Sequence, residues 1–191
     1  MTARRGLLIV ISGPSGVGKD TLIRRLFEKD HNLRKTVSYT TRRARPGELE
    51  GVDYLYVRPD ELSTRILEGQ VLEHAEYDGN VYATSAAQVD DYRSAGYDTI
   101  LKIDVQGAEQ VRQRVPDALF IFIEPPSMAE LERRLAMRNT ESEKDLAARL
   151  EIAKTEMSYR SRYDYVVIND DVDRAAHEVL RIIRKARERQ T

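Results

Sequence analysis

The sequence predicts an α/β fold built on a parallel sheet, and two observations carry this prediction. The first is a short apolar run from Gly6 to Ser12, which has the Ile- and Val-rich pattern of a strand buried on both faces. The second is the alternation of such runs with segments of helical periodicity, which is typical of βαβ units. A chain of 191 residues has room for one well-cored domain with small inserted lobes.

Each element of this core follows from its own pattern. After the first strand, the segment from Thr21 to Glu28 places apolar side chains at helical spacing and predicts a helix that packs on the sheet. The further strand candidates are Tyr97 to Asp104, Asp117 to Ile123 and Tyr163 to Ile168. They are followed by helical patterns that begin near Gln106, Ser127 and Val172 respectively.

Two segments interrupt the alternation. From Ser38 to about Thr84 the chain is rich in Tyr, Arg, Gly and short β-like pieces, which predicts an inserted, mostly-β lobe. From about Arg134 to Arg149 it is almost entirely polar, as in a helical lid. We therefore expect one domain spanning 1–191, with a core of about 1–37, 85–133 and 150–191, a lobe of about 38–84 and a lid of about 134–149.

Composition narrows the class of protein. Lys and Arg total 31 against 32 Asp and Glu, so no basic excess indicates a nucleic acid or a membrane surface as partner. The absence of cysteine excludes disulfides and cysteine nucleophiles and fits a reducing compartment. The first apolar run stops at Gly13, short of a signal peptide. We expect a cytoplasmic protein, monomeric or homodimeric, whose partners are small molecules.

A glycine-rich segment joins the first strand to the first helix. Its sequence is Gly13-Pro14-Ser15-Gly16-Val17-Gly18-Lys19, a G-x-x-x-x-G-K pattern in the strand and helix context that the motif requires. Glycines let backbone N–H groups converge on phosphate oxygens, and Lys19 can reach the β- and γ-phosphates. The pattern predicts a P-loop core that binds a nucleoside triphosphate such as ATP.

The position after Lys19 departs from the motif. A hydroxyl that binds Mg²⁺ usually stands there, whereas this chain has Asp20, followed by Thr21. Asp20 could be a Mg²⁺ ligand, or an acid that merely favours the positive end of the helix dipole. The sequence leaves both interpretations open.

The inserted lobe carries the string Val37-Ser38-Tyr39-Thr40-Thr41-Arg42-Arg43-Ala44-Arg45-Pro46-Gly47-Glu48, followed by Gly51-Val52-Asp53-Tyr54. Further along come Leu72-Glu73-His74-Ala75 with Gly79 and Tyr82, then Ile103-Asp104-Val105-Gln106-Gly107-Ala108, and finally Asn169-Asp170-Asp171. In these motifs and their order the sequence resembles the guanylate kinase family over nearly the whole chain. The resemblance implies phosphorylation of GMP by ATP with Mg²⁺.

The resemblance also implies roles for residues of the lobe. Ser38, Arg42, Arg45, Tyr54 and Tyr82 match positions that surround the GMP phosphate, and Glu48 of the same motif is a further candidate substrate-binding residue. Glu73 matches the position that accepts hydrogen bonds from guanine N1–H and the 2-amino group, and Thr84 matches a hydroxyl beside O6. Without the resemblance, Glu73 would be taken for an ordinary exposed acid.

In the lid, the resemblance implies that Arg134, Arg138 and Arg149 close over the triphosphate and that Asn169 lies near the adenine. With Lys19 and Arg42, these arginines are the candidate catalytic residues, because phosphoryl transfer needs positioning and positive charge. Arginines on helices are more often solvated surface residues, and that alternative stays open for each.

A second departure lies at a strand end. Lys102 stands where the family usually has an acid near the metal, two residues before Asp104. We expect Asp20 and Lys102 to be a charge exchange of the hydroxyl that usually follows the loop lysine and the acid that usually ends the strand. The two side chains should then lie within contact distance. Asp20 and Asp104 are then the candidate metal ligands, and Asp104 also lies among the candidate substrate-binding residues.

Two alternatives to a GMP kinase remain. The first is a kinase of a related sugar phosphate such as ribose bisphosphate, although such an acceptor has no guanine edge for Glu73 and Thr84 to bind. The second is a non-catalytic interaction module of the same fold, although such modules typically have damaged P-loops and this chain keeps Lys19 and the glycines.

Overall fold

The computed structural model of the protein describes residues 4–77, 79–137 and 143–190, and its centre is a five-stranded parallel sheet. The strands are β1 (Leu8–Ser12), β2 (Leu33–Lys35), β7 (Asp98–Lys102), β8 (Leu119–Glu124) and β9 (Tyr165–Ile168), in the spatial order β2-β7-β1-β8-β9. Every neighbouring pair runs parallel. All residues of the central strand β1 are fully buried, as expected for a strand covered on both faces.

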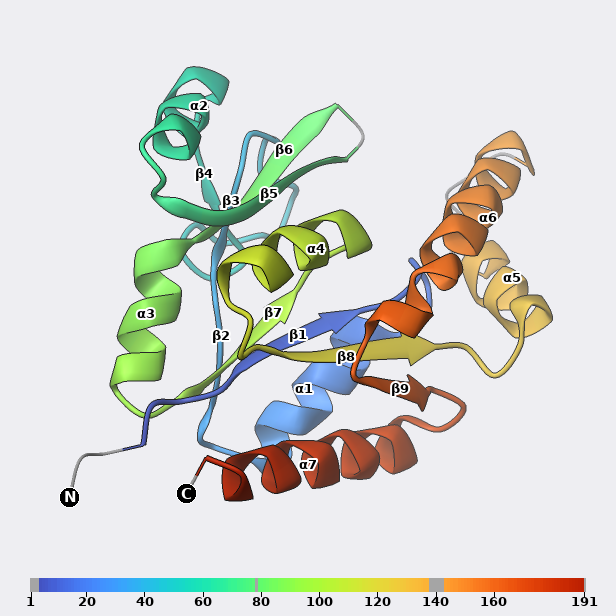
Figure 1. The fold of residues 1–191 in the computed structure, drawn as a ribbon. Helices are drawn as coiled ribbons and strands as arrows, with labels where there is room; N and C mark the ends of the chain where they lie inside the picture. Colours follow the sequence, from blue (N-terminus) through green and yellow to red (C-terminus); the bar gives the residue numbers. More distant parts are fainter. Residues whose placement is uncertain (1–3, 78, 138–142, 191) are drawn as a thin grey trace.

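Helices cover both faces of this sheet. Figure 1 shows α1 (Lys19–Lys29) and α7 (Val172–Glu188) on one face, and α3 (Ala86–Ser94) and α4 (Val105–Arg114) on the other. Alternate residues of β1 serve the two faces: Ile9 and Ile11 belong to the core under α1 and α7, whereas Leu8 and Val10 belong to the core under α3 and α4. No described helix is both long and apolar enough to cross a membrane.

Two further helices stand together beyond the carboxyl end of β8. They are α5 (Met128–Ala136) and α6 (Glu143–Ser158), and a short 3₁₀ turn, Arg160–Arg162, leads from α6 to β9. Leu146 and Leu150 of α6 pack against the main core, and Ala153 is buried in it. One side of α6 is thereby fixed to the core, and the opposite side is free to face the edge where β1 and β7 end.

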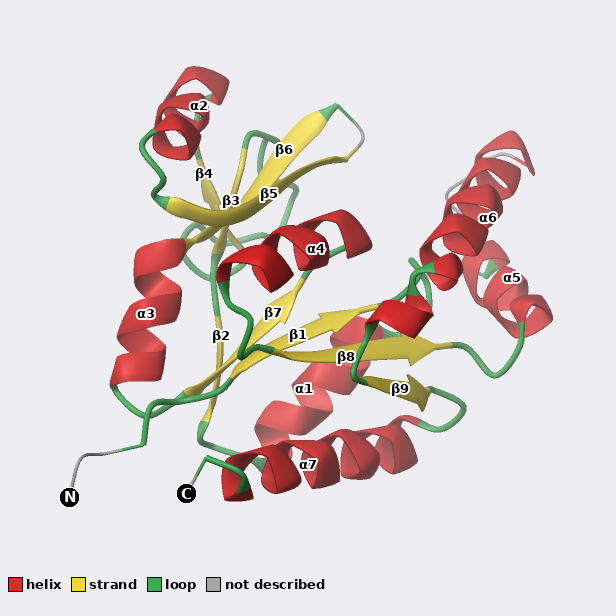
Figure 2. Ribbon diagram, viewed as in Figure 1, coloured by secondary structure: helices red, strands yellow, loops and turns green. Residues whose placement is uncertain are grey.

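A second sheet of four strands carries β3 (Ser38–Thr40), β4 (Tyr54–Tyr56), β5 (Val71–Tyr77) and β6 (Asn80–Ser85), in the spatial order β4-β3-β6-β5. The helix α2 (Pro59–Leu67) packs on it through the buried Leu62. Figure 2 shows α4 between the two groups of strands. Its contacts explain this place, because Gln110 exchanges hydrogen bonds with the backbone of His74 in β5. Helix α4 therefore fixes the second sheet over the first.

The expected parallel core is confirmed, with the four predicted strands at β1, β7, β8 and β9 and the four predicted helices at α1, α4, α5 and α7. The sequence patterns missed β2, α2 and α3. Strand β2 has three residues and only Leu33 is buried. Helix α3 buries only Val89 and Arg93, and a buried arginine gives no apolar signal. Both elements are too weakly patterned to be found by periodicity.

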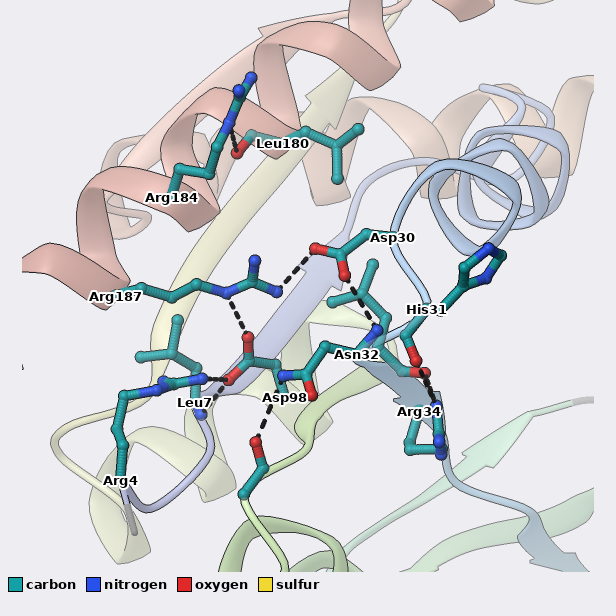
Figure 3. Close-up of polar contacts among 12 residues, drawn as sticks. Arg4, Leu7, Asp30, His31, Asn32, Arg34, Asp98, Leu180, Arg184 and Arg187 are labelled. Carbon is teal, nitrogen blue, oxygen red and sulfur yellow. Dashed lines mark hydrogen bonds and ion pairs between the residues drawn. The ribbon is translucent and has the colours of Figure 1, made fainter. Parts of the chain in front are cut away.

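A buried aspartate ties the far end of the sheet to its helices (Figure 3). Asp98 of β7 is fully buried, and its Oδ1 accepts hydrogen bonds from Arg4 Nη2 and from the Leu7 amide, both at 2.7 Å. Its Oδ2 accepts from Arg187 Nε of α7 at 2.6 Å. Arg187 also donates to Asp30, at the end of α1, over 2.7 Å. One carboxylate thus joins the amino-terminal segment, β7 and α7.

Replacing Asp98 with Asn is expected to lower the free energy of unfolding by about 2 to 3 kcal/mol, because it leaves two arginines without their buried counter-charge. The arginines are each about one-quarter exposed (24% and 25%), so water limits the loss. Urea unfolding at pH 7 measures the change. The matched control is Asp90→Asn, which breaks the exposed pair with Arg5 and should cost less than about 1 kcal/mol. Equal losses in the two variants would contradict the role given to Asp98.

Candidate functional site

The glycine-rich segment forms a loop between the carboxyl end of β1 and α1. Gly16 and Gly18 have φ angles of +84° and +97°, in the region that side chains strongly disfavour. A Cβ at Gly18 would lie 2.7 Å from the Asn169 side-chain nitrogen, and a Cβ at Gly16 would lie 2.7 Å from a methyl carbon of Leu135. The loop therefore needs glycine at these positions both for its backbone angles and for its close packing.

Lys19 opens α1 and turns its side chain back over the loop. Its Nζ donates to the carbonyl oxygens of Gly13 at 2.5 Å and Pro14 at 3.0 Å. Burial lowers the pKa of Lys19 to about 8, and the nearby Glu156 carboxylate acts in the opposite direction. Lys19 is thus a partly buried cation fixed to the glycine-rich loop, which is an arrangement suited to a phosphate anion.

Two predicted residues brace the loop from behind. The Asn169 amide donates to the Val17 carbonyl at 2.8 Å, and Asn169 is only 5% exposed. Arg134 of α5 donates to the Val17 carbonyl at 3.2 Å and to the Asn169 carbonyl at 3.1 Å, and it pairs with Glu130 at 2.7 Å. The structure therefore places both residues against the backbone of the loop. Their contacts with adenine and triphosphate stay predictions.

A cavity of about 350 Å³ opens between the second sheet and the carboxyl ends of β1 and β7; we call it the lobe cavity. All of the predicted substrate-binding residues line it: Ser38, Arg42, Arg45, Glu48, Tyr54, Glu73, Tyr82, Thr84 and Asp104. Residues from β3, β4, β5, β6 and the start of α4 are brought together in this way. These residues span more than sixty positions of the sequence. The fold of the lobe is therefore what brings them into one cavity.

Glu73 is the buried acid of the lobe cavity. It lies on β5 opposite Thr84 of β6, is 4% exposed, and its Oε1 accepts a hydrogen bond from Thr84 Oγ1 at 2.6 Å. Its Oε2 approaches Gly107, where a Cβ would lie 2.5 Å away, so any larger residue there would push the acid aside. Burial raises the pKa of Glu73 to about 7, against the lowering effect of the Thr84 hydrogen bond. Glu73 and Thr84 thus form a buried pair of hydrogen-bonding side chains.

Cationic groups lie elsewhere in the same cavity. Arg42 Nη2 donates to both oxygens of Glu48, at 2.8 and 3.1 Å, and its guanidinium lies 5.3 Å from the centroid of the Tyr54 ring. Glu48 also accepts from the Arg45 amide and from the Tyr56 hydroxyl. The hydrogen bonds from Arg42 contribute most to lowering the pKa of Glu48 to about 2. Glu48 thus holds Arg42 in place through charge-assisted hydrogen bonds.

A larger cavity of about 1010 Å³ adjoins the first and runs between the loop and α6; we call it the loop cavity. Of the predicted nucleotide-binding and lid residues, it is lined by Ser15, Gly16, Gly18, Lys19, Asp20, Thr21 and Arg149. Arg138 lies outside the described residues. Six of the residues that the structure describes line both cavities and so mark where they meet: Lys19, Arg45, Tyr77, Lys102, Asp104 and Glu156.

The two departures from the family motifs meet at this junction. Lys102 Nζ donates to Asp20 Oδ1 at 2.5 Å, which confirms the expected contact between the two side chains. Loss of hydration beside the cavity acts to raise the pKa of the exposed Asp20, but the hydrogen bond and charge of Lys102 outweigh this effect and lower that pKa. Asp104 caps α4, where its Oδ1 accepts from the Gly107 amide at 2.8 Å.

Glu156 and Tyr77 were not predicted from the sequence. Glu156 lies on α6 seven residues after Arg149, so two helical turns place both side chains on one face of the helix. That spacing was the available signal, but the polar character of the whole segment concealed it. Tyr77 ends β5, and nothing in its local pattern points to a cavity.

A glycine-rich loop at the carboxyl end of a parallel sheet, with a partly buried lysine fixed to it and two polar cavities that adjoin each other, defines a P-loop nucleotide-binding protein of the α/β class. The comparison with known proteins is more specific. The protein-family model described as guanylate kinase matches residues 5–186, and the chain belongs to the guanylate kinase family.

Individual relatives agree with this assignment. The chain is 50% identical over 182 residues to a guanylate kinase of Streptococcus thermophilus (strain CNRZ 1066), covering 95% of this chain and 87% of that protein. It is also 50% identical over 179 residues to one from Lactococcus lactis subsp. lactis (strain IL1403), covering 94% and 87%. Its structure is similar to the crystal structure of guanylate kinase from Anaplasma phagocytophilum, with a TM-score of 0.79, 37% identity, and coverage of 97% and 88% of the two chains.

Proposed function

We propose that the protein transfers the γ-phosphoryl group of ATP to the phosphate of GMP, and of dGMP, to form ADP and GDP or dGDP. The observation that carries this proposal is the pair of adjoining cavities: one is lined by the phosphate-binding loop, the other ends in the buried Glu73–Thr84 pair, and Lys19 stands where they meet. Family membership and the guanylate kinase relatives support the same reaction.

The buried acid explains the choice of base. An ionised Glu73 offers only acceptors, and guanine presents two donors on one edge, N1–H and the 2-amino group. Adenine has an acceptor at N1 and no 2-amino group, so it would leave the carboxylate unpaired in a buried site. Sites built on such hydrogen bonds reject the mismatched ligand by roughly 10⁴ to 10⁵.

The cations explain the binding and transfer of phosphate. Arg42 and Arg45, with the hydroxyls of Ser38, Tyr54 and Tyr82, would hold the GMP phosphate in the lobe cavity. The loop and Lys19 would hold the triphosphate in the loop cavity. Because phosphoryl transfer depends on alignment and charge neutralisation, this convergence of cations at the junction is the expected machinery, and no side-chain nucleophile is needed.

Mg²⁺ is part of the proposal, and the residues present fit it. Among the described residues, no group of three or more His, Asp or Glu side chains could hold a metal alone. Asp20, Thr21 and Asp104 nevertheless line the loop cavity with oxygen atoms, which is the chemistry that Mg²⁺ prefers when phosphate and water complete its shell. When bound, Mg²⁺ supplies positive charge to the phosphate oxygens. Asp20 and Asp104 would hold it directly or through water.

The Asp20–Lys102 pair should be energetically coupled. Asp20→Ser leaves Lys102 uncompensated beside the cation and should lower kcat/KM for MgATP and raise the Mg²⁺ requirement. Adding Lys102→Glu, which restores the family's usual charges, should recover much of the loss. Because the Asp20 side chain is 77% exposed, we expect a coupling energy only somewhat above about 1 kcal/mol in the double-mutant cycle. Two single effects that simply add would show that each departure has a separate cause.

An ADP-release assay with GMP, dGMP, AMP and ribose bisphosphate as parallel acceptors tests the proposed function. We expect release with GMP and dGMP only. Release with ribose bisphosphate would indicate the sugar-phosphate alternative, and no release with any acceptor would indicate an interaction module. Neither alternative has support from the relatives named above. A cytoplasmic location and a monomeric or homodimeric state stay predictions, which fractionation and light scattering can test.

A further inference from the structure

Glu156 occupies a place that the proposed reaction leaves unexplained. It projects from α6 into the junction between the cavities and lines both of them. Of the six residues at this junction, three are cations, Lys19, Arg45 and Lys102, and would favour phosphate. A carboxylate on the same wall repels phosphate. The proposed reaction therefore gives no reason for an acid at this position.

The side chain of Glu156 faces groups that bind anions. Burial raises the pKa of Glu156, and Lys19 and the backbone of Ser15, both in the glycine-rich loop, act in the opposite direction by favouring its charged form. The Oε2 atom of Glu156 is buried and has no hydrogen-bond partner among the described residues. Loop amides and a P-loop lysine are the groups that bind the phosphate chain of a nucleotide. Glu156 thus uses two of the partners that a triphosphate needs.

We infer that Glu156 is an internal competitor of the nucleotide: its carboxylate takes the place of a phosphate group at Ser15 and Lys19, and ATP must displace it in order to bind. The inference rests on the proposed use of the loop for ATP. Because the carboxylate belongs to α6, its displacement also releases a contact between α6 and the loop. Glu156 therefore stabilises the nucleotide-free loop and lowers the affinity of the loop for ATP.

Titration calorimetry on Glu156→Gln tests this inference. The amide keeps the shape of the side chain and removes its charge, so ATP should bind roughly 5- to 20-fold more tightly than to the wild type, without divalent cations in the buffer. Inorganic tripolyphosphate, which carries the phosphate chain alone, should show the same gain. Glu156→Ala serves as a second variant with the same expected direction. The matched control is Glu151→Gln on the exposed side of α6, which should leave both affinities unchanged.

Three outcomes would overturn the inference. Unchanged or weaker ATP binding in both Glu156 variants would show that the carboxylate does not compete with phosphate. An equal gain in Glu151→Gln would show a general effect of net charge. A gain for ATP but none for tripolyphosphate would place the effect away from the phosphate chain. The ADP-release assay on the wild type separates these results from a failure of the proposed function, because GMP-dependent release can be present whether or not Glu156 competes.

Discussion

In a Glu73→Gln variant, kcat/KM for GMP is expected to fall at least about 10²-fold, or about 2.7 kcal/mol of transition-state binding, while the affinity for ATP changes little. The amide turns one of two acceptors into a donor, and that donor would face a donor of the guanine edge. The mismatch is costly because Glu73 is 4% exposed and water cannot relieve it. Steady-state kinetics with GMP at saturating ATP, and calorimetry with ATP, measure the two effects.

Glu73 should also make kcat/KM for GMP depend on pH. The pKa of Glu73 is raised to about 7, so the carboxyl is protonated below that pH and would present a donor where guanine needs an acceptor. In the free enzyme, kcat/KM for GMP should therefore fall as the pH drops from 8 to 6. The phosphate of GMP also titrates near this range. Glu73→Gln serves as the reference, because its pH profile keeps the contribution of the GMP phosphate and lacks that of the Glu73 carboxyl. Identical profiles for the two proteins would remove Glu73 from the base site.

The core of the fold could be predicted because its signals are local. β1 is an uninterrupted buried strand, and the loop after it contains glycines whose positive φ angles leave little choice of residue. The second sheet was predicted only as a β-rich segment. Its strands β3 and β4 have three residues each, and Pro59 starts a helix within the same segment. Such short elements depend on their partners in the sheet, so local sequence does not determine them.

The candidate site could be predicted only where family motifs supplied the missing geometry. Periodicity alone would have made Glu73 an exposed acid, whereas the structure buries it against Thr84 and Gly107. No motif covered Glu156, and its place at the junction depends on how α6 packs over the loop. The contact between Asp20 and Lys102 was predictable for a general reason, because the loop after one strand and the end of its parallel neighbour meet at the same edge of a sheet.

Replacing Lys19 with Ala is expected to lower kcat by about 10² to 10³-fold, because a cation that follows the transferring phosphoryl group acts mainly in the transition state. The structure adds a reason to expect a large effect. Lys19 is held to the loop by the carbonyls of Gly13 and Pro14, so its charge is already in place before the substrates bind. Preorganised charge in a partly buried site is worth more than the same charge in water.

The division of the loss between kcat and KM decides what Lys19 does. A loss in kcat with a modest change in the KM for ATP would assign the lysine to the transition state, whereas a loss confined to KM would assign it to ground-state binding. Lys154→Ala is the matched control, since Lys154 lies exposed on α6 in an ion pair with Glu151. It should retain wild-type kinetics. Urea unfolding of both variants shows whether the fold survives. Lys19→Ala should be the less stable of the two, because removal of Lys19 leaves Glu156 without its counter-charge.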